Sequence, residues 1–234
     1  EDVLVCAAAL KLDRPIKWIE DRRENLMACN HSREQRHRVR AAIDSNGRVL
    51  ALDDEFFHDQ GAYVRTHGAR VADGTASMLQ GPYHVPAFRV VGHYRLTNKT
   101  PAATYRSPGR FESTFVHERL MDAIAQKLGL DRLEVRRRNL ISGAQMPYER
   151  PLTVQGEPIT LDSGDYPAHL DKVLARVRWD ELQADIAQRK AEGEAVGLGI
   201  AYFLEKSGQG PLERVRVTVD TTGAVELVTG VASV

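Results

Sequence analysis

The fold is decided by one stretch of the chain, residues 35–57, which reads QRHRVRAAIDSNGRVLALDDEFF. Before residue 44, apolar side chains alternate with polar ones, which is the spacing of a β-strand with one covered face. Asn46 and Gly47 then supply residues that tolerate the positive φ angles of a tight hairpin turn. Val49 to Phe57 reads as the return strand. The sequence therefore predicts a β-hairpin over residues 35–58.

Two helices are predicted farther along the chain. The first spans residues 112–128 and ends at Gly129, a residue type that favours the left-handed conformation after a helix. Its apolar residues recur at intervals of three and four and define one face, formed by Phe111, Phe115, Leu120, Met121, Ile124, Ala125 and Leu128. The second helix follows Asp131 and Glu134, a capping-box pattern, and runs to about residue 140. We expect its arginines at 136–138 to lie on a solvated or subunit-facing surface.

The other segments carry weaker signals. Residues 59–86 contain six glycines or prolines and predict a long loop, which in a compact domain is usually functional. Around it we expect a buried helix over residues 3–10, a short strand over 16–19, a turn or short helix over 21–28 with Asp21 as its N-cap, and a strand over 88–96. In the last third we expect helices near 170–177 and 180–193, the latter capped by Asp180, and strands over 196–204, 212–219 and 225–231.

Together these elements predict an α+β fold of two layers, with helices packed on mixed or antiparallel sheets, because the regular strand–helix alternation of a parallel sheet is absent. The loop-rich residues 146–166 predict a linker between a first α+β unit, residues 1–145, and the start of a second, truncated α+β unit, residues 167–234. The turns at 44–47 and 220–223 are similar in sequence, which either chance or an internal repeat explains. Both ends of the chain indicate a segment of a longer polypeptide.

Composition narrows the classes of function. The 234 residues carry 32 Lys and Arg against 32 Asp and Glu, so the formal charge is zero. A protein that binds nucleic acid or an anionic membrane would carry a basic excess. No apolar run approaches the roughly 20 residues of a membrane-spanning helix. The two cysteines, Cys6 and Cys29, are expected to be buried thiols in a reducing compartment, which indicates a cytoplasmic protein.

Generic catalytic motifs are absent from the sequence. The eight histidines show no metal-ligand spacing, and no nucleophile elbow or glycine-rich phosphate loop is found. One stretch differs from the rest, because residues 105–110 place a tight turn directly before the predicted helix 112–128. Free amides and the positive end of the helix dipole attract anions at such a position. The stretch predicts either an anion site flanked by two arginines or a plain turn in which Ser107 caps the helix.

The same stretch carries a resemblance to a known family. Residues 105–110 (YRSPGR), 118–122 (ERLMD), 128–131 (LGLD) and 136–141 (RRRNLI) resemble the molybdenum-binding subunit of the xanthine oxidase family. That family includes xanthine dehydrogenases, aldehyde oxidoreductases and aerobic carbon monoxide dehydrogenases. Shorter blocks at 14–17 (RPIK), 21–24 (DRRE), 59–63 (DQGAY) and 83–86 (YHVP) agree in order and spacing.

The resemblance implies an internal segment of a molybdenum hydroxylase catalytic subunit. The full-length enzyme would hold a molybdopterin dinucleotide with molybdenum, hydroxylate an N-heterocycle or aldehyde with oxygen from water, and pass electrons to iron–sulfur and FAD partner subunits or domains. It would be a cytoplasmic dimer of heterotrimers. The family's catalytic Glu and the glycine-rich cofactor loops lie outside these 234 residues. The segment alone is therefore expected to be inactive, with no catalytic residue, metal ligand or bound cofactor of its own.

The resemblance also implies which residues approach the substrate and cofactor. The first unit, residues 1–145, would be of molybdopterin-binding type, with its active-site loop at 104–112. The pocket residues in this loop would be Tyr105, Arg106, Ser107, Pro108, Gly109 and Arg110.

Two of these residues bear on the substrate. Ser107 stands where many members have Gly and where carbon monoxide dehydrogenases have a copper-binding Cys. A hydroxyl is a poor ligand for Cu(I), which argues against that activity. Pro108 stands where xanthine oxidases have a Phe that stacks on the purine, so xanthine is disfavoured. An aromatic amine, an N-heterocycle or an aldehyde is favoured instead. A non-catalytic adaptor or an anion-binding module of the same fold remains the alternative.

Overall fold

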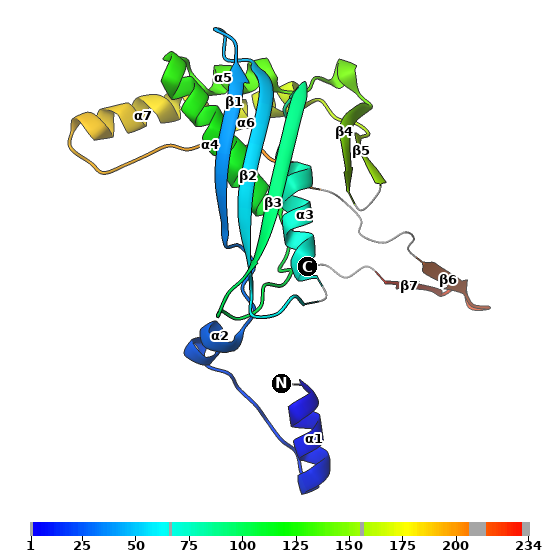
Figure 1. The fold of residues 1–234 in the computed structure, drawn as a ribbon. Coiled ribbons are helices and arrows are strands. Elements are labelled where there is room, and N and C mark those ends of the chain that lie inside the picture. Colours follow the sequence, from blue (N-terminus) through cyan, green and yellow to red (C-terminus); the bar gives the residue numbers. More distant parts are fainter. Residues whose placement is uncertain (1, 66, 155–156, 206–213, 231–234) are drawn as a thin grey trace. The chain divides into compact units, whose positions relative to one another are not determined.

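The computed structural model describes residues 2–65, 67–154, 157–205 and 214–230 (Figure 1). Contacts within the chain divide it into two compact units, Glu1–Leu204 and Glu205–Val234. None of the described helices is long and apolar enough to cross a membrane. The division of the chain into units 1–145 and 167–234, joined by a linker over 146–166, stays a prediction.

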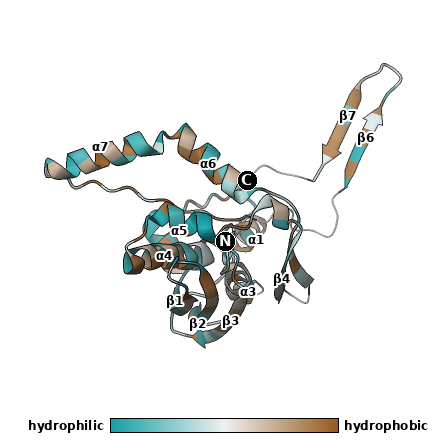
Figure 2. Cartoon of the chain, turned by 90° about the horizontal axis from the view of Figure 1, so that it is seen from above, coloured by the Kyte–Doolittle hydropathy of each residue, from teal (hydrophilic) through white to brown (hydrophobic). Residues whose placement is uncertain are grey.

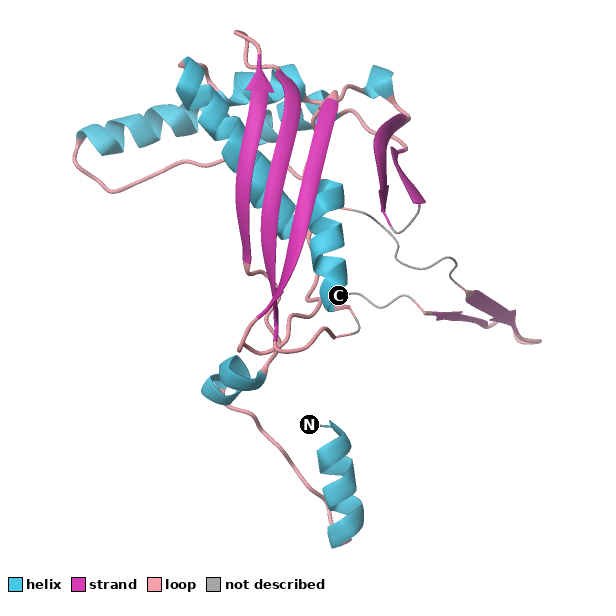
Figure 3. Ribbon diagram, in the orientation of Figure 1, coloured by secondary structure: helices cyan, strands magenta, loops and turns pink. Residues whose placement is uncertain are grey.

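A three-stranded sheet forms the framework of the first unit (Figure 3). Its strands are β1 (Gln35–Ile43), β2 (Val49–Gly61) and β3 (Ala87–Leu96), in that spatial order. β1 runs antiparallel to β2, with Gln35 opposite His58, whereas β3 runs parallel to β2. The predicted hairpin over 35–58 is confirmed, and the sheet is mixed, as the predicted α+β fold allows.

The turn of this hairpin forms through the chemistry that its sequence predicts. Gly47 adopts a φ of +79°. The carboxylate of Asp44 accepts hydrogen bonds from the amides of Asn46 and Arg48 at 2.8 and 2.9 Å. The turn is also tied to a helix, because the side chain of Asn139 donates to the carbonyl of Gly47 at 2.9 Å. Local turn chemistry and a long-range contact therefore fix the same register.

Helices cover one face of the sheet (Figure 1). They are α3 (Gly68–Met78), α4 (Arg110–Leu128) and α5 (Arg132–Asn139). As predicted, Gly129 ends α4 in the left-handed conformation, and Asp131 caps α5 by accepting from two of its amides. The core between sheet and helices includes Val49, Leu52, Tyr83, Val85, Met121, Ile124, Ala125, Leu133, Val135 and Leu140. Leu170 and Leu174 of α6 (Tyr166–Arg176) extend this core.

The remaining elements lie before and after this framework. The N-terminal helices are α1 (Asp2–Leu12) and α2 (Arg22–Ala28), and α2 begins with a complete capping box between Asp21 and Glu24. After α5 come a short 3₁₀ turn (Gly143–Gln145), the hairpin of β4 (Tyr148–Val154) and β5 (Glu157–Leu161), and helix α7 (Trp179–Ala191).

The described part of the second unit is the hairpin of β6 (Val215–Val219) and β7 (Val225–Thr229). Asp220 accepts hydrogen bonds from the amides of Thr222 and Ala224, the same turn chemistry as at Asp44. Figure 2 shows the apolar residues of these two strands in brown, and their side chains are exposed. Cross-strand pairing rather than a buried core therefore holds this hairpin together in the described chain.

Several local predictions are wrong. The predicted loop 59–86 contains helix α3, and two of the glycines that indicated a loop, Gly68 and Gly74, lie within this helix. Residues 16–19 and 196–204 form no strand. The second of these segments instead packs Leu198, Ile200 and Tyr202 on the core. Helix α7 is preceded by Arg178 in a left-handed conformation, so Asp180 is not its cap.

Predictions of burial also need correction. Helix α1 buries no residue, and both Cys6 and Cys29 are exposed, because no other described segment covers them. On α4, Phe115 is 70% exposed, whereas the polar side chains of His117 and Glu118 are buried. Glu134 does not complete a capping box at α5, because its carboxylate accepts from Arg138 instead.

Arg136 lies inside the protein, not on the predicted outer surface of α5. Its side chain is 0% exposed, and its guanidinium bonds to the carboxylates of Glu118 and Asp122, each at 2.9 Å. The hydroxyl of Tyr83 donates to the other oxygen of Glu118 at 2.5 Å. Burial, together with the neighbouring negative charge of Glu118, raises the pKa of Tyr83 well above its ordinary value, so the phenol stays a donor.

We expect Arg136→Met to lower the free energy of unfolding by about 3–5 kcal/mol, because it leaves the carboxylate of Glu118 buried without its cation. Urea unfolding of the purified protein, followed by tryptophan fluorescence, measures this loss. Arg137→Met is the matched control, because Arg137 pairs with Asp171 at the surface and its loss should cost at most about 1 kcal/mol. Equal losses would contradict the structural role of Arg136.

The buried imidazole of His117 predicts a pH dependence of stability. Burial lowers its pKa from 6.5 to about 4. Between these values the unfolded chain binds a proton that the folded protein does not, so the free energy of unfolding falls as the pH falls from 6.5 to 4. The slope for this one group is at most about 1.4 kcal/mol per pH unit. We expect His117→Asn to flatten the slope in urea unfolding at several pH values, and an unchanged slope would contradict this.

Candidate functional site

The predicted loop, residues 105–110, leads into the first turn of α4. Tyr105 is 70% exposed and Arg106 is also exposed, whereas Gly109 is buried. Gly109 is the N-cap of α4 with a φ of +80°, and its carbonyl accepts from the amide of Ser113 at 3.0 Å. Ser107 therefore does not cap the helix as the plain-turn interpretation required. The loop presents Tyr105 and Arg106 to solvent and keeps Gly109 inside.

The base of the loop touches helix α3 without an intervening side chain. A Cβ atom on Gly109 would lie 2.6 Å from the carbonyl oxygen of Val71 and closer still to the backbone of Gly74 and Thr75. A Cβ atom on Gly74 would lie 2.5 Å from the carbonyl oxygen of Pro108. Real Cβ atoms do not approach other atoms so closely. Two facing glycines thus set the distance between α3 and the loop.

The tip of the loop also needs an unusual backbone conformation. Ser107 has a φ of +54°, which is uncommon for a residue with a side chain. Glycine reaches this region at no steric cost. The left-handed backbone gives a physical reason for the Gly that many members of the resembled family have at this position.

Arg33, which precedes β1, holds the loop from outside it. Its Nη2 atom donates to the carbonyls of Tyr105 and Arg106 at 3.1 and 2.9 Å, and its Nη1 atom donates to the carboxylate of Glu112 at 3.2 Å. The guanidinium also lies 4.2 Å from the ring centre of Phe111. Sequence reasoning missed Arg33, since it lies more than 70 residues from the loop and no motif surrounds it.

A buried polar network lies between the sheet and α3. The amide of Gln35 donates to the hydroxyl of Thr75 at 3.0 Å and bonds to the Nδ1 atom of His58 at 3.2 Å. His37 connects Gln35 to the buried carboxylate of Asp54. Burial lowers the pKa of His58, which favours a neutral imidazole. Because Thr75 also lies against Gly109, this network supports the helix on which the loop rests.

Two further groups of polar side chains, the adjacent His58 and Asp59 and the potential metal ligands, form no site in the described residues. Asp59 does not orient His58, because its carboxylate binds the amide of Gly61, the hydroxyl of Thr97 and the ammonium of Lys99. Among the residues that the structure describes, no group of three or more His, Cys, Asp or Glu side chains could hold a metal ion.

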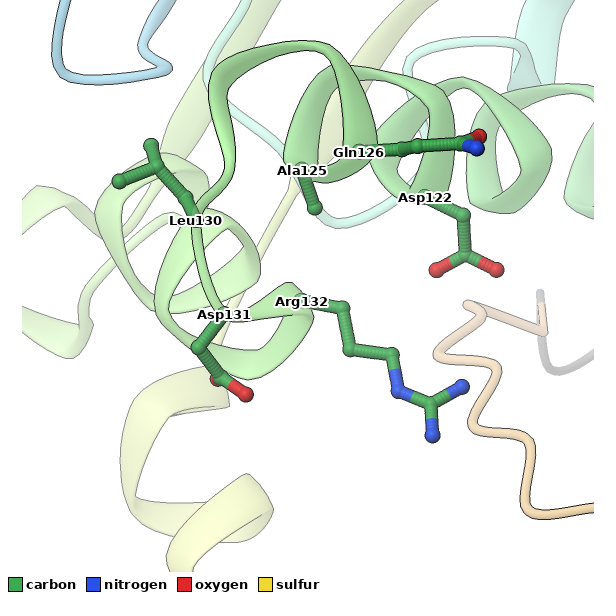
Figure 4. Close-up of a pocket in the computed structure, with 6 residues that line it drawn as sticks. All are labelled: Asp122, Ala125, Gln126, Leu130, Asp131 and Arg132. Carbon is green, nitrogen blue, oxygen red and sulfur yellow. The ribbon is translucent and has the colours of Figure 1, made fainter.

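A pocket lies at the opposite end of α4. Its lining comes from the end of α4 and the start of α5, namely Asp122, Ala125, Gln126, Leu130, Asp131 and Arg132 (Figure 4). Asp122 follows Arg110 by 12 residues, about 18 Å along the helix axis. The carboxylate of Asp122 is already paired with the buried Arg136. This pocket is therefore separate from the loop.

Comparison with known proteins decides the family. Residues 1–140 match the family model of the molybdopterin cofactor-binding domain. The chain belongs to this family. The resemblance on which the loop was assigned is thereby confirmed at the level of the family.

Similar proteins align with most or all of this chain. It is 40% identical over 234 residues to the 6-hydroxypseudooxynicotine dehydrogenase complex subunit gamma of Paenarthrobacter nicotinovorans, covering 100% of this chain and 30% of that protein. It is 34% identical to the carbon monoxide dehydrogenase large chain of Hydrogenophaga pseudoflava, covering 88% of this chain and 26% of that protein. The crystal structure of quinoline 2-oxidoreductase from Pseudomonas putida 86 matches with a TM-score of 0.84 and 31% identity, covering 99% of this chain and 31% of that chain. The chain thus spans about 30% of the length of these relatives.

We expect Gly109→Ala to destabilise the protein more than Gly129→Ala. Both glycines have positive φ angles, +80° and +66°, but a Cβ atom on Gly129 would meet nothing within 4 Å. The shared conformational cost is about 1–2 kcal/mol, and the clash with α3 should add about 1–3 kcal/mol at Gly109 alone. Urea unfolding of the two variants measures the difference. Equal destabilisation would show that α3 does not fix the loop.

Proposed function

We propose that this chain contributes one wall of the active-site pocket in the catalytic subunit of a molybdenum hydroxylase, and that residues 105–110 form this wall. The loop itself carries the proposal. Its backbone is fixed by α3 and by Arg33, whereas the side chains of Tyr105 and Arg106 are exposed. A rigid backbone with an exposed cation is suited to binding a ligand, since little ordering is needed when the ligand arrives.

The residues present fit an oxygen-rich, anionic group. The loop precedes the N-terminus of α4, a helix of 19 residues, where the helix dipole favours negative charge. Arg106 adds a planar fork of donors and a permanent positive charge. When bound, the molybdopterin cofactor supplies the transfer of a water-derived oxygen to carbon. The part of this chain is to orient the substrate and to stabilise the negative charge that develops on oxygen.

An N-heterocycle is the substrate class that we propose, with an aldehyde as the second candidate. The names of two relatives, a 6-hydroxypseudooxynicotine dehydrogenase subunit and a quinoline 2-oxidoreductase, support a heterocycle. Ser107 disfavours carbon monoxide as the substrate, because its hydroxyl is a poor ligand for the copper ion of carbon monoxide dehydrogenases. Pro108 offers no aromatic face for stacking on a purine.

For the whole protein we propose iron–sulfur and FAD subunits or domains as electron acceptors, a cofactor of the dinucleotide type, and a dimer of heterotrimers in the cytoplasm. The name of one relative, a complex subunit gamma, supports assembly with other subunits. Within the longer protein, residues 1–145 and 167–234 would belong to separate α+β units joined by the linker 146–166.

Two measurements on the full-length subunit with its partners test the activity. Metal and pterin analysis should find molybdenum and molybdopterin in equal amounts. Oxidation of an N-heterocycle in ¹⁸O-labelled water should place the label in the product. A purified protein without molybdenum would favour the non-catalytic adaptor or the anion-binding module instead.

We expect Arg106→Ala to lower turnover in the full-length enzyme by roughly 10²–10³-fold, the usual effect of losing one electrostatic stabiliser. Molybdenum content and thermal stability should change little, because Arg106 is exposed. Arg119→Ala is the control, since Arg119 is an exposed arginine of α4 that pairs with Asp122. Wild-type turnover in Arg106→Ala would remove the loop from the active site.

A further inference from the structure

We propose that Arg33 is the positioning residue of the 105–110 loop and that it sets the direction of the loop's peptide groups toward the pocket. This inference rests on the proposed function, because it assigns Arg33 a role in the reaction of that pocket. Arg33 itself lies behind the loop, and it would act on the substrate only through the backbone that it holds.

The direction of the peptide groups follows from two hydrogen bonds. The carbonyls of Tyr105 and Arg106 both point at the Nη2 atom of Arg33, at 3.1 and 2.9 Å. In a trans peptide unit the N–H points opposite to the C=O, and the described cis bond of this chain lies elsewhere, at Met146–Pro147. The amides of Arg106 and Ser107 are therefore turned away from Arg33. The guanidinium on one side of the loop thus fixes the direction of two consecutive backbone N–H groups on the other side.

The charge on Arg33 is itself held in place. Its Nη1 atom pairs with Glu112, whose side chain is 4% exposed, and its flat face lies over the ring of Phe111. A carboxylate buried this deeply needs a cation beside it. The guanidinium thus meets a carboxylate, two carbonyls and an aromatic face at once. A lysine ammonium lacks the planar fork for this set of contacts.

The segment that carries Arg33 is anchored at the end of the sheet. His31 forms a β-bridge with Ala102, and its carbonyl accepts from the amide of Ala103 at 2.9 Å. On the other side of Arg33, the carbonyl of Glu34 accepts from the amide of Asp59 at 3.2 Å. Because His31 and Glu34, on the two sides of Arg33, are both bound to strands or their extensions, Arg33 holds the loop against a fixed support.

The test compares variants of the full-length enzyme with its partners. Arg33→Ala alone would leave the buried carboxylate of Glu112 without its cation and could unfold the region. The informative variant is therefore Arg33→Ala combined with Glu112→Gln, which removes both charges. Arg33→Lys is the conservative second variant. Arg40→Ala is the matched control, because Arg40 is an exposed arginine of β1 that pairs with Asp53.

The readouts separate positioning from stability. We expect the double variant to keep its molybdenum and its thermal unfolding temperature, and to lose turnover by about 10–100-fold, with kcat falling more than KM changes. Hydrogen exchange of a peptide covering residues 103–112, measured in the cofactor-free full-length protein, should become faster. Millimolar guanidinium should restore part of the turnover of the double variant. Arg33→Lys should lose less turnover than the double variant, and Arg40→Ala should match the wild type in every readout.

The outcomes are distinguishable. If Arg106→Ala loses turnover but neither Arg33 variant does, the positioning role is wrong and the proposed function stands. If the Arg33 variants lose turnover while exchange of residues 103–112 is unchanged, Arg33 does not act through the loop, which also overturns the inference. If Arg106→Ala keeps full turnover, the loop is not part of the pocket and both proposals fall.

Discussion

The guanidinium of Arg136 lies wholly inside the protein, where it binds Glu118 and Asp122 of α4 and reaches the carbonyl of Ile200. It therefore joins α4, α5 and the segment around Ile200 at one point. The fixed position of α4 matters for the site, because the candidate loop is the direct continuation of that helix. An ion pair at the middle of α4 thus contributes to the placement of residues at its beginning.

Much of this fold could be predicted, because its signals are local. The 35–58 hairpin is specified by the alternation of apolar and polar residues and by the Asp44–Gly47 turn. Gly129 specifies the end of α4, and Asp131 specifies the start of α5. The failures share a different cause. Helix α3 and the buried face of α4 depend on partners far along the chain: Gly74 faces Pro108, and Glu118 faces Arg136. No local period reveals such pairs.

The candidate site likewise has a part that the sequence predicts and a part that it does not predict. Residues 105–110 could be singled out from the sequence, because the turn before a helix and the family resemblance both point to them. Arg33 and Gly74 could not be singled out from the sequence, because their importance lies in their contacts with the loop, which only the structure shows. The exposed Arg106 lies where the resemblance expects a ligand-facing side chain, but its role in the reaction stays a proposal. The sequence singled out the candidate ligand-facing residues, and the structure added the residues that support them.

The contact between Gly74 and Gly109 has a consequence for how such enzymes diversify. At these two positions any side chain would collide with backbone, so the base of the loop tolerates almost no change. At the tip, Ser107 and Pro108 are half-buried, and Ser107 carries a side chain although its φ of +54° lies in the region that favours glycine. Under the proposed function, we therefore expect substitutions that change substrate preference to be found at the tip of the loop, and the two glycines at its base to be retained.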